Sequence, residues 1–76
     1  MEQELSFGEK AVGRTFNPGG NTQVDSIKVD FANIIDDLND LREASDNPET
    51  KRMLSIAITE AQTAQMWAVK AVTWQF

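Results

Sequence analysis

One short segment of this chain combines residue types that can bind a small phosphate-bearing ligand. A loop reads Gly-Arg-Thr-Phe-Asn, and Lys28 follows in the first turns of the next expected helix. Arg14 and Lys28 can donate charge-assisted hydrogen bonds to phosphate, and a helix N-terminus adds backbone N–H groups. The ring of Phe16 offers a flat surface on which a nucleobase can stack. The candidate ligand site consists of Gly13, Arg14, Thr15, Phe16, Asn17 and Lys28.

A purely structural role explains the same residues. A phenylalanine in a loop usually packs against the core, and Lys28 could form an ion pair with Asp25, three residues earlier on the same helix. The spacing of these residues does not decide between the two interpretations.

A second group of polar residues interrupts the apolar C-terminal third of the chain. It contains Thr59, Gln62, Thr63 and Lys70. Threonine and glutamine on an interface helix often complete interhelical hydrogen bonds, which is the alternative to a binding role. A buried lysine without a carboxylate is costly, so Lys70 requires an anion. We therefore count Thr59, Thr63 and Lys70 as candidate ligand-binding residues.

Most residue types that serve catalysis or metal binding are missing. The chain has no histidine, no cysteine and no glycine-rich phosphate loop of the Walker type, so hydrolysis or group transfer would need an unusual active site. Asp36, Asp37 and Asp40 could bind a metal, but they lie consecutively or one turn apart without a glycine-bearing loop, and such a run is ordinarily a solvated face. We expect a binding protein with no catalytic residue, metal or cofactor.

The segment from Pro48 to Trp74 should be a long helix that organises the rest. Asn47 suits the N-cap and Pro48 the first helical position, and no later glycine or proline interrupts the run. One stripe of small residues consists of Ala57, Ala61, Ala64, Ala68 and Ala71. Because the segment is apolar on nearly every side, it must be buried all round, and a chain of 76 residues has too little other material to do so. We expect copies to associate; a core helix of a monomer is the alternative.

Two further helices are expected upstream. Ser6 and Glu9 have capping-box spacing, which predicts a short helix over about residues 6–12. Asn21 or Thr22 can cap a helix over about 22–44 that runs antiparallel to the segment at 48–74 after a short link. Its apolar residues alternate by three and four, and the expected seam consists of Val24, Ile27, Phe31, Ile34, Leu38 and Leu41. Lys28 falls off this seam.

The intervening loop, residues 13–21, has strong turn chemistry. Pro18 and Gly19 suit the central positions of a type II turn. The fold class is therefore all-α: one domain over residues 1–76, with a short N-terminal helix and a long antiparallel helical hairpin that assembles into a homo-oligomer.

Charge and hydropathy restrict the partners. Twelve acidic and seven basic residues give a net charge of −5, which argues against binding duplex nucleic acid. No run approaches the roughly 18 apolar residues of a membrane span, and the N-terminal residues lack the apolar region of a secretory signal. We expect a cytosolic protein with no membrane partner.

The same residues resemble a known family. The chain resembles the phage anti-CBASS cyclic-nucleotide sponges of the type 2 family in three places. These are the segment FGEKAVGRTFNPGGN, the Ile27-Lys28 step, and the run Ser55–Thr63 that leads to Met66 and Lys70–Val72. The helical-hairpin domain of that family also occurs in the Thoeris anti-defence sponge. The likeness runs from about Phe7 to Trp74.

The resemblance implies a hexamer of three dimers that sequesters cyclic di- and trinucleotides without cleaving them, in the cytoplasm of an infected bacterium. Lys28 and the Gly13–Asn17 loop would hold a cyclic dinucleotide at a dimer contact, with a base on Phe16. Lys70 would face a cyclic trinucleotide between three protomers. Relatives can place a tyrosine nearer Gly13 and Arg14, and at the position of Lys70 they often carry arginine, whose planar fork lysine lacks.

Other functions stay open at this stage. A small oligomeric helical module that recognises another protein needs only the apolar helix and the acidic face. A nuclease or phosphodiesterase would have to act without histidine. Which cyclic nucleotide would be preferred, and which defence system would be countered, is also open.

Overall fold

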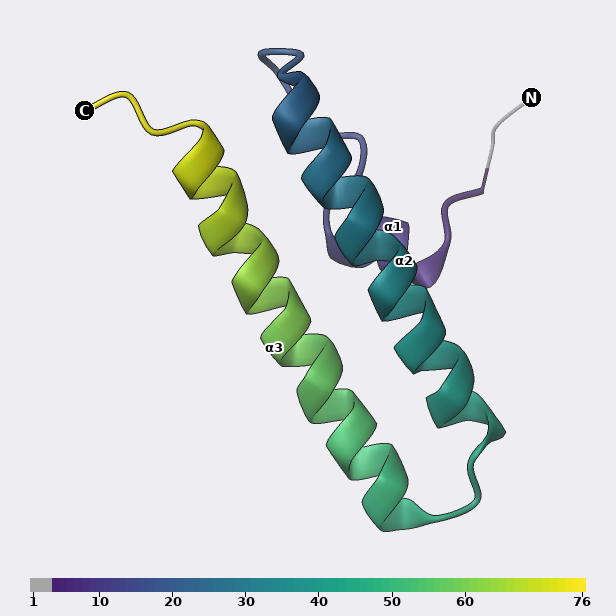
Figure 1. Ribbon diagram of the computed structural model, residues 1–76. Coiled ribbons are helices and arrows are strands. Elements are labelled where there is room, and N and C mark those ends of the chain that lie inside the picture. Colours follow the sequence, from purple (N-terminus) through teal and green to yellow (C-terminus); the bar gives the residue numbers. More distant parts are fainter. Residues whose placement is uncertain (1–3) are drawn as a thin grey trace.

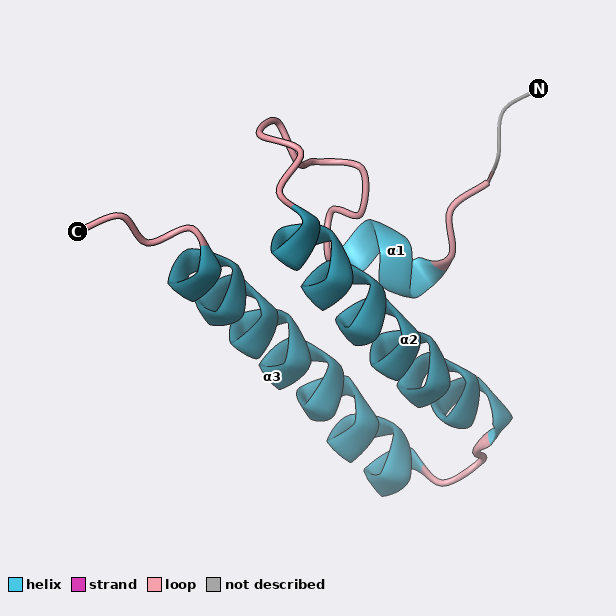
Figure 2. Cartoon of the chain, turned by 45° about the horizontal axis from the view of Figure 1, so that its top comes forward, coloured by secondary structure: helices cyan, strands magenta, loops and turns pink. Residues whose placement is uncertain are grey.

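The computed structural model describes residues 4–76. It consists of two long helices and one short helix (Figure 1). Helix α1 spans Phe7–Ala11, α2 spans Thr22–Ala44 and α3 spans Pro48–Val72. Helices α2 and α3 lie side by side as an antiparallel hairpin, and α1 packs against α2 (Figure 2). The expected all-α architecture is confirmed. Of the domain predicted over residues 1–76, the first three residues lie outside the described part.

Side-chain caps set the start of each helix. Glu9 N donates to Ser6 Oγ at 3.0 Å and Ser6 N to Glu9 Oε1 at 2.8 Å, so the predicted capping box is present. The side chain of Asn21 accepts hydrogen bonds from two backbone N–H groups of α2, and Asn47 does the same for α3, where Pro48 lies in the first turn. Each cap satisfies donors that the helix itself leaves free. Helix α3 ends two residues before the predicted boundary.

The buried face of α2 differs from the expected seam. Its buried residues are Val24, Lys28, Ala32 and Ile35. Ile34 and Leu41, which we assigned to the seam, are 49% and 58% exposed. For these two residues the assignment was wrong, because α2 contacts both α1 and α3 and its buried arc lies between two partners. Val24 is buried as expected, and Phe31 and Leu38 pack against the core. Lys28, expected off the seam, is inside the buried face.

Helix α1 approaches α2 through a glycine. Gly8 N donates to Asp36 Oδ1 at 2.6 Å, and a Cβ atom at Gly8 would lie only 2.1 Å from the carbonyl oxygen of Ala32. The N-terminal turn of α1 therefore sits directly on the backbone of α2. This contact holds the start of the loop that carries the candidate site.

The hairpin is a single layer of helices. The principal-axis extents are 45 × 37 × 12 Å, so the molecule is flat, with one dimension far smaller than the other two. The radius of gyration is 13.8 Å, whereas a compact chain of this length has about 11 Å. The buried apolar residues are correspondingly few: Val12, Val24, Ala32, Ile35 and Ile58.

A layer this thin leaves much apolar surface uncovered. The exposed large apolar residues are Phe7, Phe16, Ile34, Leu41, Met53, Ile56, Met66, Trp67, Trp74 and Phe76. Four of the ten lie on α3, namely Met53, Ile56, Met66 and Trp67, so one side of this helix is left uncovered. Trp74 and Phe76 follow its end. Between residues 4 and 76, no helix is both long and apolar enough to cross a membrane.

We expect Gly8→Ala to destabilise the fold by about 1–3 kcal/mol, the usual cost of overpacking a close contact. The new methyl group would meet the Ala32 carbonyl, a backbone atom that cannot rotate away. Gly19→Ala is the matched control, because nothing lies within 4 Å of a Cβ atom there and Gly19 does not have a positive φ. Urea denaturation at one protein concentration, followed by circular dichroism, compares the two variants. Equal midpoints would contradict the close packing of α1 on α2.

Candidate ligand-binding site

The loop before α2 is held in one shape by its own hydrogen bonds. Gly20 N donates to Asn17 O at 3.0 Å and closes a turn around Pro18 and Gly19. The positive φ of 61° belongs to Gly20 and not to Gly19, so the predicted type II turn is wrong. Asn17 and Asn21 also exchange two hydrogen bonds, at 2.8 and 3.2 Å. The loop therefore presents its carbonyl groups in a defined direction.

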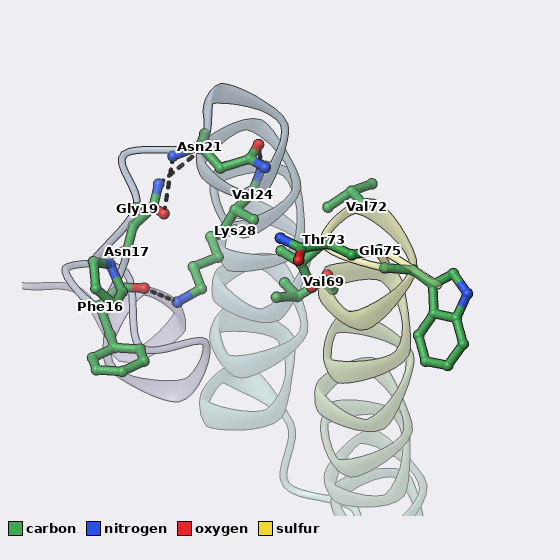
Figure 3. Close-up of a pocket in the computed structure, with 12 residues that line it drawn as sticks. Phe16, Asn17, Gly19, Asn21, Val24, Lys28, Val69, Val72, Thr73 and Gln75 are labelled. Carbon is green, nitrogen blue, oxygen red and sulfur yellow. Dashed lines mark hydrogen bonds between the residues drawn. The ribbon is translucent and has the colours of Figure 1, made fainter.

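Lys28 extends from α2 into this loop (Figure 3). Lys28 is only 5% exposed. Its Nζ donates hydrogen bonds to Gly13 O at 2.9 Å and to Phe16 O. Nζ also lies 5.5 Å from the ring centroid of Phe16. Gly13 has a φ of 63°, a conformation that glycine adopts without strain. The ammonium group thus ties both ends of the segment 13–16 to α2.

The charge of Lys28 has no carboxylate partner in the part of the chain from residue 4 onward. The ion pairs found there are Arg14–Asp25 and Arg52–Glu49. Asp25, which could have paired with Lys28, binds Arg14 instead, with N–O distances of 2.5 and 3.5 Å. Backbone carbonyls stabilise an ammonium group but do not neutralise it. A positive charge therefore persists where little water reaches it, and such a charge attracts an anion strongly.

A cavity of about 520 Å³ lies beside Lys28. The loop residues 16–19 line one wall, and the C-terminal end of α3 lines the opposite wall with Val69, Val72 and residues 73–75. Val24 and Lys28 line it from α2 (Figure 3). The cavity thus combines an ammonium group, an exposed aromatic ring and apolar side chains. This combination suits a ligand that carries both a negative charge and a flat base.

The family model for the Acb2/Tad1, hairpin domain matches residues 9–73 of the 76. The match contains the loop, Lys28 and both long helices. The chain belongs to the Acb2/Tad1 hairpin domain family. This confirms the resemblance to the type 2 anti-CBASS and Thoeris anti-defence sponges, and the family is consistent with a sponge role in anti-defence. Comparisons with curated proteins and with solved structures give no match.

Of the residues predicted for the first site, the structure brings four together. Gly13 and Phe16 bind Lys28 through their carbonyl groups, and Asn17 lines the same cavity. Arg14 lies elsewhere: it lines a separate cavity of about 250 Å³ between α1 and α2. Thr15 is exposed and lines neither cavity.

The second predicted group lies on the outer side of α3 and not at this cavity. Thr59 and Thr63 are exposed, and their hydroxyl groups donate to backbone carbonyls one turn earlier, at 3.2 and 3.1 Å. Among residues 4–76, neither hydroxyl group makes an interhelical hydrogen bond. Lys70 is exposed, with Nζ 5.2 Å from the ring centroid of Trp67 and 5.9 Å from that of Trp74. Lys70 therefore does not line the cavity, but it adjoins Trp74, which does.

The wall that α3 contributes was missed from the sequence. Val69, Val72 and the segment Thr73–Gln75 looked like ordinary parts of an apolar helix and its end. The predicted antiparallel hairpin could have revealed this wall, because it places the end of α3 beside the start of α2, where Lys28 lies (Figure 1). Gln62, the remaining polar residue of the second group, donates to Ala11 O at 3.4 Å and so joins α3 to the end of α1.

The acidic run on α2 has no metal-binding arrangement. Within residues 4–76, no group of three or more potential histidine, cysteine, aspartate or glutamate ligands comes together. Asp36 accepts the hydrogen bond from Gly8 described above, whereas Asp37 and Asp40 are exposed.

We expect Lys28→Met to loosen the loop, because the thioether keeps much of the length of the side chain but cannot donate to Gly13 O and Phe16 O. A hydrogen bond from a charged group contributes about 1.5–3 kcal/mol, so amide exchange over residues 13–20 should accelerate about tenfold or more. Lys51→Met, on an exposed position of α3, is the control and should leave this exchange unchanged. Unaltered exchange in Lys28→Met would show that the ammonium group does not hold the loop.

Proposed function

We propose that this protein is a sponge that binds cyclic dinucleotides without cleaving them and so withholds them from a bacterial immune effector. The observation that carries the proposal is the ammonium group of Lys28, which is buried, has no carboxylate partner among residues 4–76 and borders a cavity. The family membership supports the same role. The sponge would act in the cytoplasm of an infected bacterium.

The chemistry of a cyclic dinucleotide fits this cavity. Such a ligand carries two phosphates, which accept charge-assisted hydrogen bonds from Lys28, and two flat bases, which stack on aromatic rings. Phe16 is 71% exposed, so its ring is free to receive a base. Because the ligand has two similar halves, a site shared by two protomers around a two-fold axis would use Lys28 and Phe16 twice. Gly13, Thr15 and Asn17 would shape the loop around it.

The surface of the protomer supports association. Its accessible area is 5559 Å², whereas a compact monomer of 8.5 kDa exposes about 4,700 Å². The excess of roughly 900 Å² is close to the roughly 800 Å² that each partner contributes to a standard protein interface. We propose that copies associate through the apolar outer side of α3, and that the assembly is a hexamer of three dimers.

The outer side of α3 would then hold the second ligand. Thr59, Thr63 and Lys70 are spaced by four and seven residues and so lie along one side of the helix. Where three copies meet, Lys70 would supply three ammonium groups to the phosphates of a cyclic trinucleotide. Trp67 and Trp74, which flank Lys70, would place aromatic surface beside them.

Binding is tested by calorimetry with 3′,3′-cyclic GMP-AMP. We expect Lys28→Ala to weaken the affinity by about 100-fold or more, because a charged contact to phosphate, worth about 1.5–3 kcal/mol, is lost twice across the two-fold axis. The mass of the variant in solution should be that of the wild type. Nucleotide recovered after heating and chromatography should be intact, and cleaved product would make the protein a hydrolase. A wild-type assembly that binds no cyclic nucleotide would favour a protein-recognition module instead.

Assembly is tested by Met66→Asp. Met66 is 60% exposed on α3, and a carboxylate there would have to be desolvated in any interface that covers this side of the helix. We expect light scattering at micromolar concentration to report a smaller particle than for the wild type, with the helix content retained. Gln23→Asp, which makes the same charge change on an exposed position of α2, should assemble normally. Equal masses for Met66→Asp and the wild type would place the interface elsewhere.

A further inference from the structure

We infer that Arg14 is a positioning residue, which binds Asp25 and thereby keeps that carboxylate away from Lys28, so that the ammonium group stays available to an anionic ligand. The inference rests on the proposed function for its biological meaning. It assigns Arg14 a different task from the direct phosphate contact that its residue type suggested.

Asp25 and Lys28 would otherwise be natural partners. They lie three residues apart on α2, and side chains at this spacing are neighbours on a helix surface. A pair between them would cancel the charge of Lys28. A phosphate would then have to displace the Asp25 carboxylate, which stays close to Lys28 because both residues belong to the same helix.

The geometry of Arg14 prevents this pairing. Its two terminal nitrogens bind the two carboxylate oxygens of Asp25 at 2.5 and 3.5 Å, so the guanidinium fork occupies both acceptors. The backbone of Arg14 is itself fixed, because its N–H donates to the carbonyl oxygen of Glu9, a residue of α1, at 2.9 Å. The Arg14 side chain is 29% exposed and that of Asp25 is 48% exposed. The guanidinium group is thus held in place before any ligand arrives.

Arg14 is also on the wrong side of the loop to touch a ligand bound at Lys28. It lines the cavity of about 250 Å³ together with Ser6, Glu9 and Asn33, and it does not line the cavity of about 520 Å³ that Lys28 borders. Among the residues that line the two cavities, the cations are Arg14 and Lys28. Glu9 and Asp36 also line the smaller cavity, where their carboxylates accept hydrogen bonds from Ser6 N and Gly8 N. With Asp25 assigned to Arg14, the remaining positive charge is on Lys28, the cation that faces the larger cavity.

Four proteins separate this role from its alternatives: the wild type, Arg14→Gln, Asp25→Asn and the double variant, each titrated with 3′,3′-cyclic GMP-AMP by calorimetry. Arg14→Gln frees Asp25 to pair with Lys28, so its affinity should fall about tenfold. Asp25→Asn should bind at least as tightly as the wild type. The double variant has no carboxylate to compete with phosphate, so its affinity should return to within about threefold of the wild type.

Two results would overturn the inference. A double variant as weak as Arg14→Gln would mean that Arg14 touches the phosphate directly. An Asp25→Asn variant as weak as Arg14→Gln would mean that the ion pair only braces the loop.

A measurement without ligand separates this inference from the proposed function. The ¹⁵N resonance of the Lys28 ammonium group should shift in Arg14→Gln, where Asp25 can reach it, and return to its wild-type position in the double variant. An unchanged resonance in Arg14→Gln would overturn the inference even if the wild type binds the nucleotide. If the wild type binds no cyclic dinucleotide but the resonance behaves as expected, the proposed function fails and the role of Arg14 in isolating Lys28 stands.

Discussion

Lys28 carries a positive charge at a position from which the fold excludes most water. Desolvating an ammonium group is costly, and the structure offsets that cost with the carbonyl oxygens of Gly13 and Phe16. The same two hydrogen bonds tie the segment 13–16 of the loop to α2, and Phe16 lies at the edge of the cavity. Lys28 therefore anchors the loop beside the cavity and also sets the sign of the charge that a ligand meets. The protein is acidic overall, but this local charge governs what the cavity can accept.

The second constraint is the thickness of the hairpin. A single layer of helices has two open faces, and α3 is apolar on the side that its own protomer leaves uncovered. Burying that side requires other copies of the chain or another protein. In our proposal the two constraints meet, because the ligand sites form where the protomers join and the apolar surface brings them together. Helix α1 contributes by holding the loop at one end, through the close contact of Gly8 with α2.

The parts of the structure that could be predicted were those set by local chemistry. Caps such as Ser6 and Asn47 act on neighbouring backbone groups, so the helices and their starts follow from short segments. The orientation of α2 could not be predicted in this way, because its buried side depends on where α1 and α3 pack. Apolar residues spaced by three and four mark a contact with one partner helix and not with two. Lys28 was identified as a candidate ligand residue, but its burial was not. The partner of Asp25 could not be chosen from spacing, since Arg14 reaches it only after the loop has folded back.

The most direct test of the account is a crystal structure of the protein with 3′,3′-cyclic GMP-AMP. We predict that a phosphate oxygen lies within hydrogen-bond distance of Lys28 Nζ, that a base stacks on Phe16, and that Asp25 remains on Arg14. A nucleotide bound away from this cavity, with Lys28 still donating only to the loop carbonyls, would contradict the account.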